Sequence, residues 1–235
     1  MTLSKTHIDK LGERLKARER TEIDLRELDE YRRSFGQAYE NGISTASQFG
    51  HKPTGRIKSN ASIVAKLQRE SIRLTQIQDI AGCRIVVANS SDQNLVVLGL
   101  TDVNRDATVI DRRDNPSHGY RAIHVIVRFD DRSVEIQVRS ELQHRWAEVS
   151  EKYSDVIDPA IKYGGGDRSV QDLLLGVSSD IAEAEDLERS DFEGALYVEE
   201  GESLESVLWS YKEHAHARLD ALMQQLNNLR GRARE

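Results

Sequence analysis

Residues 134–139 alternate strictly between apolar and polar side chains. The apolar positions are Val134, Ile136 and Val138, and the polar positions are Glu135, Gln137 and Arg139. Because successive side chains of a strand point to opposite faces, this pattern predicts a half-buried β-strand and therefore a sheet. An acid on such a strand can bind a metal ion or accept a proton, and a guanidinium can bind phosphate. The stretch therefore suggests phosphate chemistry on a rigid element.

Periodicity elsewhere in the chain predicts helices around a small group of strands. Helices are expected over residues 8–47, 59–69, 140–153 and 169–230, the last interrupted at 191–202. Strands are expected over residues 83–88, 107–110, 122–129 and 133–139. Loops are expected over residues 49–55 and 159–166, which are rich in glycine and proline.

These elements predict an α/β (α+β) protein with a mixed sheet flanked by helices. Along the sequence we expect an N-terminal helical region (1–50), a core (51–155) and a helical C-terminal extension (156–235). Apolar residues recur at helical spacing over residues 208–229. Core packing is the default for such a stripe, and an oligomer interface is the next interpretation.

Composition restricts the cellular setting and the partners. No segment approaches the ~20 apolar residues that cross a bilayer, and the polar N-terminus has no signal-peptide pattern. The single cysteine, Cys83, excludes an internal disulfide and fits a reducing cytoplasm. The net charge of −7 argues against a general nucleic-acid coat.

A basic cluster precedes the helix expected over residues 59–69. Its members are Arg56, Lys58, Ser59, Ser62 and Lys66. Cations beside the free backbone amides of a helix start favour bound phosphate. Alone, this short motif fits a solvated basic helix start better.

Two further clusters lie at strand edges. Asp79 precedes one strand and Arg84 lies within it, so Asp79 is either a metal ligand or a turn cap. Tyr120 and His124 lie where a loop enters another strand. Tyr120 either stacks on a nucleobase or packs at the loop base, and His124 alone is more often a core histidine than a catalyst. His144 and Glu148 are also spaced as an ordinary helix-surface pair.

The order and spacing of these clusters resemble the synthetase domain of the RelA/SpoT family, nucleotide pyrophosphokinases that make guanosine alarmones. The resemblance covers about residues 30–155. It rests on Arg56-Ile57-Lys58-Ser59 with Ser62, Ile63 and Lys66; Asp79-Ile80-Ala81-Gly82 with Arg84; Gly119-Tyr120-Arg121 with His124; and Glu135-Ile136-Gln137-Val138-Arg139 with Trp146.

The resemblance implies a mixed, roughly five-stranded nucleotidyltransferase-like sheet. It also implies transfer of the β,γ-pyrophosphate of ATP to the 3'-hydroxyl of an acceptor. The implied ATP-binding residues are Arg56 and Arg84 beside the adenine, with Lys58, Ser62 and Lys66 on the phosphates. The implied catalytic residues and Mg²⁺ ligands are Asp79 and Glu135, and Glu135 would also help deprotonate the hydroxyl. The implied acceptor-binding residues are Tyr120, Arg121, His124, Gln137 and His144.

The acceptor remains open. Alarmone makers usually carry a Lys and an Asn before the Gly-Tyr pair and a Glu-His pair after the tryptophan, and this chain has neither. Besides GDP or GTP, the 3' CCA end of tRNA is therefore an alternative acceptor, as in toxic small members neutralised by antitoxins. Arg112-Arg113 near the loop hints at tRNA. A catalytically inactive binding module is a lower alternative, because both carboxylates are present. Too few residues precede Arg56 for the family's hydrolase domain, so we expect no alarmone hydrolysis.

Overall fold

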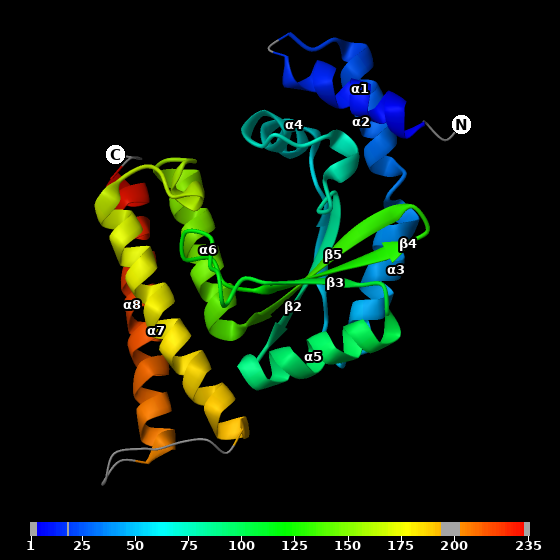
Figure 1. The fold of residues 1–235 in the computed structure, drawn as a ribbon. Helices are drawn as coiled ribbons and strands as arrows, with labels where there is room; N and C mark the ends of the chain where they lie inside the picture. The colour runs from blue at the N-terminus through cyan, green and yellow to red at the C-terminus, as the bar shows by residue number, and fades with distance from the viewer. Residues whose placement is uncertain (1–3, 18, 194–202, 233–235) are drawn as a thin grey trace. The chain divides into compact units, whose positions relative to one another are not determined.

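The computed structural model describes residues 4–17, 19–193 and 203–232 and confirms the expected fold class (Figure 1). A five-stranded mixed sheet is flanked by helices, and the C-terminal region is helical. The chain forms two compact units whose segments interleave along the sequence. The first comprises Met1–Ile85, Leu98–Val109 and His124–Gln137, and the second comprises Val86–Val97, Ile110–Ile123 and Val138–Glu235. The three-part division by sequence stays a prediction.

The sheet has the strand order β1-β2-β5-β4-β3. Its strands are β1 (Thr54–Ile57), β2 (Ala81–Val87), β3 (Thr108–Asp111), β4 (Ile123–Phe129) and β5 (Arg132–Ser140). β1 pairs antiparallel with β2, with Arg56 opposite Gly82 and Thr54 opposite Arg84. In β5 the predicted alternation is confirmed over residues 134–138, where Val134, Ile136 and Val138 are fully buried. Arg139, predicted on the polar face, is also buried, at 4% exposed.

In the first unit, helix α3 (Gly36–Ser47) covers the apolar side of the strands. A Cβ atom at Gly42 would lie 2.7 Å from Cγ1 of Val134, so only glycine permits this approach of helix to strand. The remaining helices of this unit are α1 (Lys5–Lys16), α2 (Glu22–Arg33) and α4 (Asn60–Arg69). Arg132 of β5 lies over the rings of Tyr31 and Phe35, at 5.2 and 5.0 Å, and this contact joins the hairpin to the N-terminal helices.

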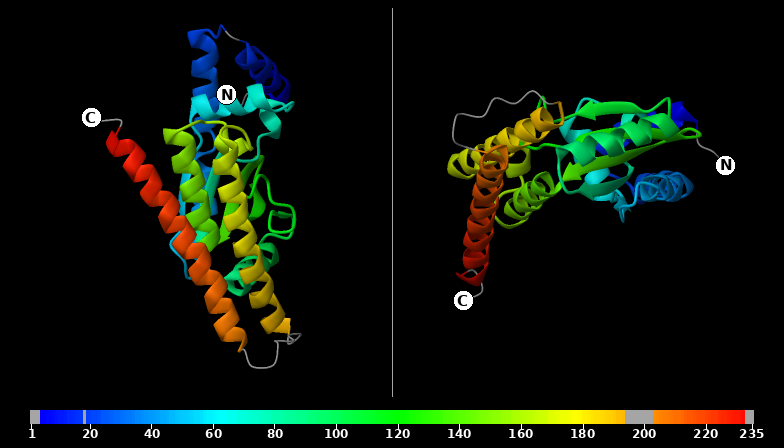
Figure 2. Two further views of the ribbon diagram at one scale, coloured as in Figure 1. Left: turned by 90° about the vertical axis from the view of Figure 1, so that its left-hand side faces the viewer. Right: turned by 90° about the horizontal axis from the view of Figure 1, so that it is seen from below.

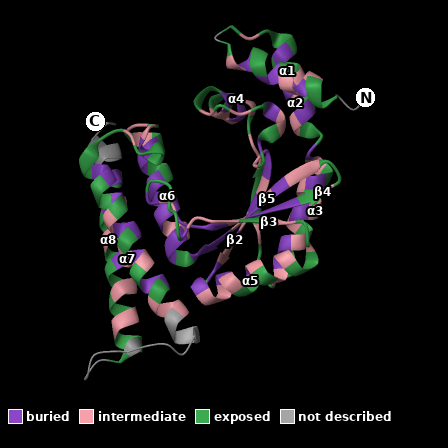
Figure 3. Ribbon diagram, in the orientation of Figure 1, coloured by how far each residue is buried: buried purple, intermediate pink, exposed green. Residues whose placement is uncertain are grey.

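The second unit is built on α6 (Glu141–Val156), α7 (Arg168–Glu193) and α8 (Leu204–Arg232), with α8 in contact with both other helices (Figures 1 and 2). Their buried positions form one cluster (Figure 3). The α8 members of that cluster are Ala215, Leu219, Leu222 and Leu226. The core interpretation of the stripe over residues 208–229 is therefore confirmed, although the side chain of Leu229 lies outside the described part.

Several boundaries differ from the sequence predictions. β1 begins inside the expected loop over residues 49–55, since its exposed residues carry no apolar alternation. Helix α5 (Ser90–Val103) was missed, because the consecutive apolar residues at 95–98 obscure any helical period. A short 3-10 helix (Ile161–Tyr163) lies in the expected loop over residues 159–166. α7 continues to Glu193, into the interruption expected at 191–202; residues 194–202 lie outside the described part. Among the described helices, none is both long and apolar enough to cross a membrane.

Candidate active site

The basic cluster at the start of α4 surrounds Asp79 in the first unit. Nζ of Lys58 donates to Oδ2 of Asp79 at 2.6 Å, and Nζ of Lys66 donates to Oδ1 at 3.1 Å. Lys58 directly follows β1 and its backbone N–H donates to the carbonyl of Ile80, so the strand pairing fixes its position. Burial alone would raise the pKa of Asp79, but the two ammonium groups outweigh it and lower the pKa. Asp79 is therefore an anion held between two cations.

A second cluster in the same unit centres on Glu135. Nδ1 of His124 lies 2.9 Å from Oε1 of Glu135, and Nε2 of Gln137 donates to Oε2 at 2.6 Å. The Glu135 and His124 side chains are only 13% and 14% exposed. Burial alone would raise the pKa of Glu135, but the contacts with His124 and Gln137 outweigh it and lower the pKa. Glu135 is therefore an ionised carboxylate with a fixed orientation on a rigid strand.

Glycine keeps the surroundings of Glu135 open. A Cβ atom at Gly82 would lie 3.1 Å from the carbonyl oxygen of Glu135 and 3.7 Å from its Cβ atom. Arg56 is opposite Gly82 and Arg84 is opposite Thr54, so the two arginines are diagonal neighbours on one face of the β1–β2 pair. The first unit thus brings together most of the predicted site residues. They are Arg56, Lys58, Ser62, Lys66, Asp79, Arg84, His124, Glu135 and Gln137.

Helix α4 begins as the basic motif predicts. Ser59 is the N-cap, and its hydroxyl accepts from the backbone N–H of Ser62 at 3.2 Å. The hydroxyls of these two serines are 2.9 Å apart. Ser62 and Lys66 therefore lie on the first turns of a capped helix, where the helix dipole favours an anion.

Tyr120 belongs to the second unit, where Arg139 holds its ring. The Arg139 guanidinium lies 5.0 Å from the ring centroid, and its Nη2 donates to the Tyr120 hydroxyl at 3.0 Å. The preceding turn has positive φ at His118 (53°) and Gly119 (85°). A side chain at Gly119 would meet Trp146 at 2.8 Å, so glycine is required both for the backbone angle and for the space. The sequence signal for this turn was the Gly-Tyr pair.

Arg121, predicted to bind the acceptor, is buried against α7. Its Nε and Nη2 atoms donate to Oε2 of Glu185 at 3.1 and 2.6 Å, and both residues are nearly inaccessible to solvent. Sequence reasoning missed Glu185, because an acid inside a long amphipathic helix carries no local signal of its partner. His144 is the other predicted acceptor-binding residue in this unit. Its Nε2 lies 3.7 Å from Oε1 of Glu148, as expected for a pair on one helix surface.

Arg113 corrects one interpretation of the sequence. It was a hint of tRNA binding, but it is buried, donates to Asp111 at 2.7 Å and donates to Oε1 of Gln93 at 3.3 Å. A buried guanidinium bonded to a carboxylate is not a cation presented to nucleic acid. Arg113 therefore gives no support to tRNA binding, and of the Arg112-Arg113 pair only Arg112 is partly exposed.

The two carboxylates of the first unit suit a hard divalent cation. Mg²⁺ binds one or two carboxylates and completes its shell with water and substrate phosphates. Asp79 and Glu135 supply oxygen ligands, and each oxygen retains a lone pair beyond the hydrogen bond described above. No group of three or more His, Cys, Asp or Glu side chains placed to hold a metal occurs among the described residues. The donor set therefore fits a magnesium ion shared with a substrate and does not form an all-protein cage.

Comparison with known proteins agrees with this arrangement. The model of the region found in RelA / SpoT proteins matches residues 55–155. GTP pyrophosphokinase YjbM of Bacillus subtilis is 32% identical over 176 residues, which cover 66% of this chain and 80% of that protein. An uncharacterized protein of Mycobacterium tuberculosis is 37% identical over 134 residues, 53% of this chain and 46% of that protein. The chain thus spans about half the length of the mycobacterial relatives it matches.

Solved structures of one alarmone synthetase are also similar to this chain. Small alarmone synthetase 1 of Bacillus subtilis has a TM-score of 0.55 at 26% identity, covering 72% of this chain and 96% of that one. The same synthetase bound to its product pppGpp has a TM-score of 0.54 at 27% identity, covering 73% and 98%. With these relatives, the chain belongs to the RelA/SpoT family.

Proposed function

We propose that this protein transfers the β,γ-pyrophosphate of ATP to the 3'-hydroxyl of a guanosine nucleotide, GDP or GTP. The observation that carries the proposal is the ionised, largely buried Glu135, held by His124 and Gln137 in the same unit as the Lys58–Asp79–Lys66 cluster. Pyrophosphoryl transfer depends on positioning and charge neutralisation, and these clusters offer both. The names of the relatives, a GTP pyrophosphokinase and a synthetase bound to pppGpp, agree with it.

The residues of the first unit divide between donor and acceptor. Arg56 and Arg84 lie on one strand face and bind the adenine between them. Lys58 and Lys66 exchange part of their contact with Asp79 for ATP phosphates, helped by Ser62 at the start of α4. Glu135 accepts the proton of the attacking hydroxyl, and His124 and Gln137 keep its oxygens oriented. Mg²⁺, bound by Asp79 and Glu135, would neutralise phosphate charge.

In the second unit, Tyr120 supplies the stacking surface for the acceptor base, with Arg139 fixing its ring. His144 on α6 contributes a polar contact to the acceptor. We place the reaction in the cytoplasm, in keeping with the single buried thiol, Cys83. The expected consequence is guanosine tetraphosphate or pentaphosphate synthesis in a stringent response.

The deciding experiment follows label from ATP labelled on its γ-phosphate into GDP, GTP or tRNA. We expect label in a guanosine nucleotide and loss of at least about a thousandfold in kcat for Glu135→Gln, because removing a group that acts in the transition state costs this order. Glu30→Gln, an exposed acid on α2, is the matched control and is expected to retain wild-type activity.

Label found only in tRNA contradicts the guanosine acceptor and supports the toxin alternative. Label in no acceptor contradicts the transferase and supports a binding module. Full activity of Glu135→Gln removes that carboxylate from the mechanism.

A further inference from the structure

We propose that Glu185 of α7 is a positioning residue for the acceptor site: it fixes the segment that presents Tyr120 and thereby sets acceptor affinity. The inference rests on the proposed function for the identity of the acceptor. Glu185 lies beyond residues 55–155, the part matched by the family model. The C-terminal helices would then be a component of the site in addition to being a hydrophobic support.

Both oxygens of the Glu185 carboxylate are engaged inside the second unit. Arg121 donates two hydrogen bonds to Oε2, at 3.1 and 2.6 Å. Nε2 of Gln143 donates to Oε1 at 2.6 Å. The exposed fractions are 2% for Glu185, 6% for Arg121 and 1% for Gln143. A carboxylate held from both sides at this depth has one orientation, and so do its partners.

These contacts form a closed circuit through Tyr120. Arg121 follows Tyr120 in the chain and binds Glu185, which binds Gln143. Oε1 of Gln143 accepts from the backbone N–H of Ser140 at 3.1 Å. Ser140 directly follows Arg139, whose guanidinium returns to the Tyr120 hydroxyl. The backbone of Tyr120 is thus fixed through Arg121, and its hydroxyl is fixed through Arg139.

Gln93 makes further hydrogen bonds to this circuit of residues. Nε2 of Gln93 donates to Oε1 of Gln143 at 2.9 Å and to the carbonyl of Val138 at 2.7 Å. Gln93 also accepts from Arg113, which is paired with Asp111. Buried ion pairs add little net stability, because desolvation offsets their attraction, whereas they do fix geometry. We therefore assign the network to positioning.

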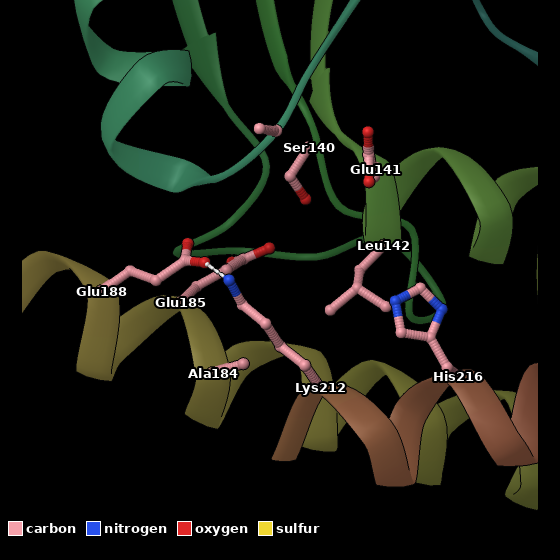
Figure 4. A pocket seen from close by; sticks show the side chains of 9 residues that line it. Ser140, Glu141, Leu142, Ala184, Glu185, Glu188, Lys212 and His216 are labelled. Atoms are coloured by element: carbon pink, nitrogen blue, oxygen red, sulfur yellow. Dashed lines mark ion pairs between the residues drawn. The ribbon is translucent and has the colours of Figure 1, made fainter. Parts of the chain in front are cut away.

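Glu188, one turn further along α7, is the natural control. Glu185 and Glu188 line a cavity of about 90 Å³ (Figure 4). Nζ of Lys212 on α8 is paired with Oε1 of Glu188 at 2.5 Å. The other oxygen of Glu188 accepts from the backbone N–H of Ser90 at 2.7 Å. The Glu188 side chain is nearly as buried as that of Glu185, 8% against 3% exposed, but none of these contacts is with the Tyr120 circuit.

The test compares Glu185→Gln with Glu188→Gln in the full chain. Calorimetry with GDP and with a non-hydrolysable ATP analogue measures the two affinities separately. For Glu185→Gln we expect GDP affinity to fall about tenfold, as for the loss of one charged hydrogen bond, with ATP-analogue affinity unchanged. Glu188→Gln is expected to leave both affinities unchanged. Hydrogen exchange over residues 117–122 should accelerate in Glu185→Gln alone.

Unchanged GDP affinity and unchanged exchange in a folded Glu185→Gln protein overturn the inference. Equal weakening of both nucleotides also overturns it, because this would be a general structural loss. If Glu185→Gln fails to fold, Glu185→Asp keeps the charge but shortens the reach, and the same selective loss is expected. If the wild-type protein transfers no pyrophosphate, the proposed function fails, and the exchange measurement still decides whether Glu185 positions residues 117–122.

Discussion

Tyr120 has two interactions that can be separated by substitution. Its ring faces Arg139, and its hydroxyl accepts a hydrogen bond from the same guanidinium. Stacking on a base requires the ring, whereas the orientation of the ring depends on the hydroxyl. At the scale of one residue, the proposed base stacking therefore depends on the aromatic ring, and the orientation of that ring depends on the hydroxyl.

We expect Tyr120→Ala to raise the acceptor KM about five- to 150-fold, because base–aromatic stacking contributes about 1–3 kcal/mol. Tyr120→Phe keeps the ring and is expected to raise the acceptor KM only a few fold. Steady-state kinetics with varied acceptor at saturating ATP measures both. Equal KM values for Tyr120→Ala and wild type would exclude stacking by this ring.

Asp111 makes stability depend on pH in the acid range. Burial alone would raise its pKa, but side-chain and backbone hydrogen bonds from Arg113 lower it below the ordinary value of 3.8. Such a group stabilises the folded state above the unfolded pKa, and this contribution is lost as pH falls through the folded pKa. We expect Asp111→Asn to lower the free energy of unfolding by about 1 kcal/mol at pH 7.

The same substitution should have a smaller effect in acid, because protonation of the wild-type carboxyl progressively removes the charge that Arg113 binds. Urea unfolding of both proteins between pH 7 and pH 3 checks this, with Asp102→Asn on the exposed side of α5 as the control. A pH-independent difference would show that the ion pair with Arg113 is not its source.

At the scale of elements, α3 packs against β5 at a distance that only a glycine at position 42 allows. The nearest atom to a Cβ at Gly42 is Cγ1 of Val134 at 2.7 Å, whereas a Cβ at Gly36 meets nothing within 4 Å. The two glycines of one helix thus have opposite surroundings. Gly42 sets the distance between α3 and β5, and hence the placement of the strand that carries Glu135.

We expect Gly42→Ala to destabilise the protein by about 1–3 kcal/mol through overpacking. Gly36→Ala should be neutral or stabilising by up to about 1 kcal/mol, because alanine favours helix and has room. Denaturant unfolding measures both, and equal midpoints for the two variants would contradict the close contact.

At the scale of the whole molecule, one cluster of buried hydrophobic residues lies along α6, α7 and α8 in the second unit (Figure 3). Leu219 of α8 is fully buried there, while Trp209 of the same helix is 66% exposed. Helix periodicity places both on one element, and only the packing of neighbouring helices distinguishes their energetic roles.

We expect Leu219→Ala to lower the free energy of unfolding by about 2–5 kcal/mol through lost burial and a cavity. Trp209→Ala should change it by less than about 0.5 kcal/mol. Thermal and urea unfolding check this pair. A large loss for Trp209→Ala would reveal a contact of that exposed ring.

The sequence determined the strand alternation at residues 134–138, the helices that precede and follow the strands along the chain, and the residue types of the site, because these depend on local period and spacing. It also indicated the hairpin between β4 and β5, whose Asp130 has the positive φ of 53° that a tight turn demands. β1 and α5 escaped detection, since the first is exposed and the second has apolar residues on several sides.

Only the tertiary structure decided which charges face each other. Arg113 and Arg121 look like surface cations in the sequence, yet both are buried against carboxylates. Lys58 and Lys66 also look like surface cations in the sequence, but both form ion pairs with Asp79 in the candidate site. A local pattern specifies period and residue type. The carboxylate partners of Lys66, Lys58 and Arg121 lie 13, 21 and 64 residues away in the chain and are brought near only by the packing of sheet and helices.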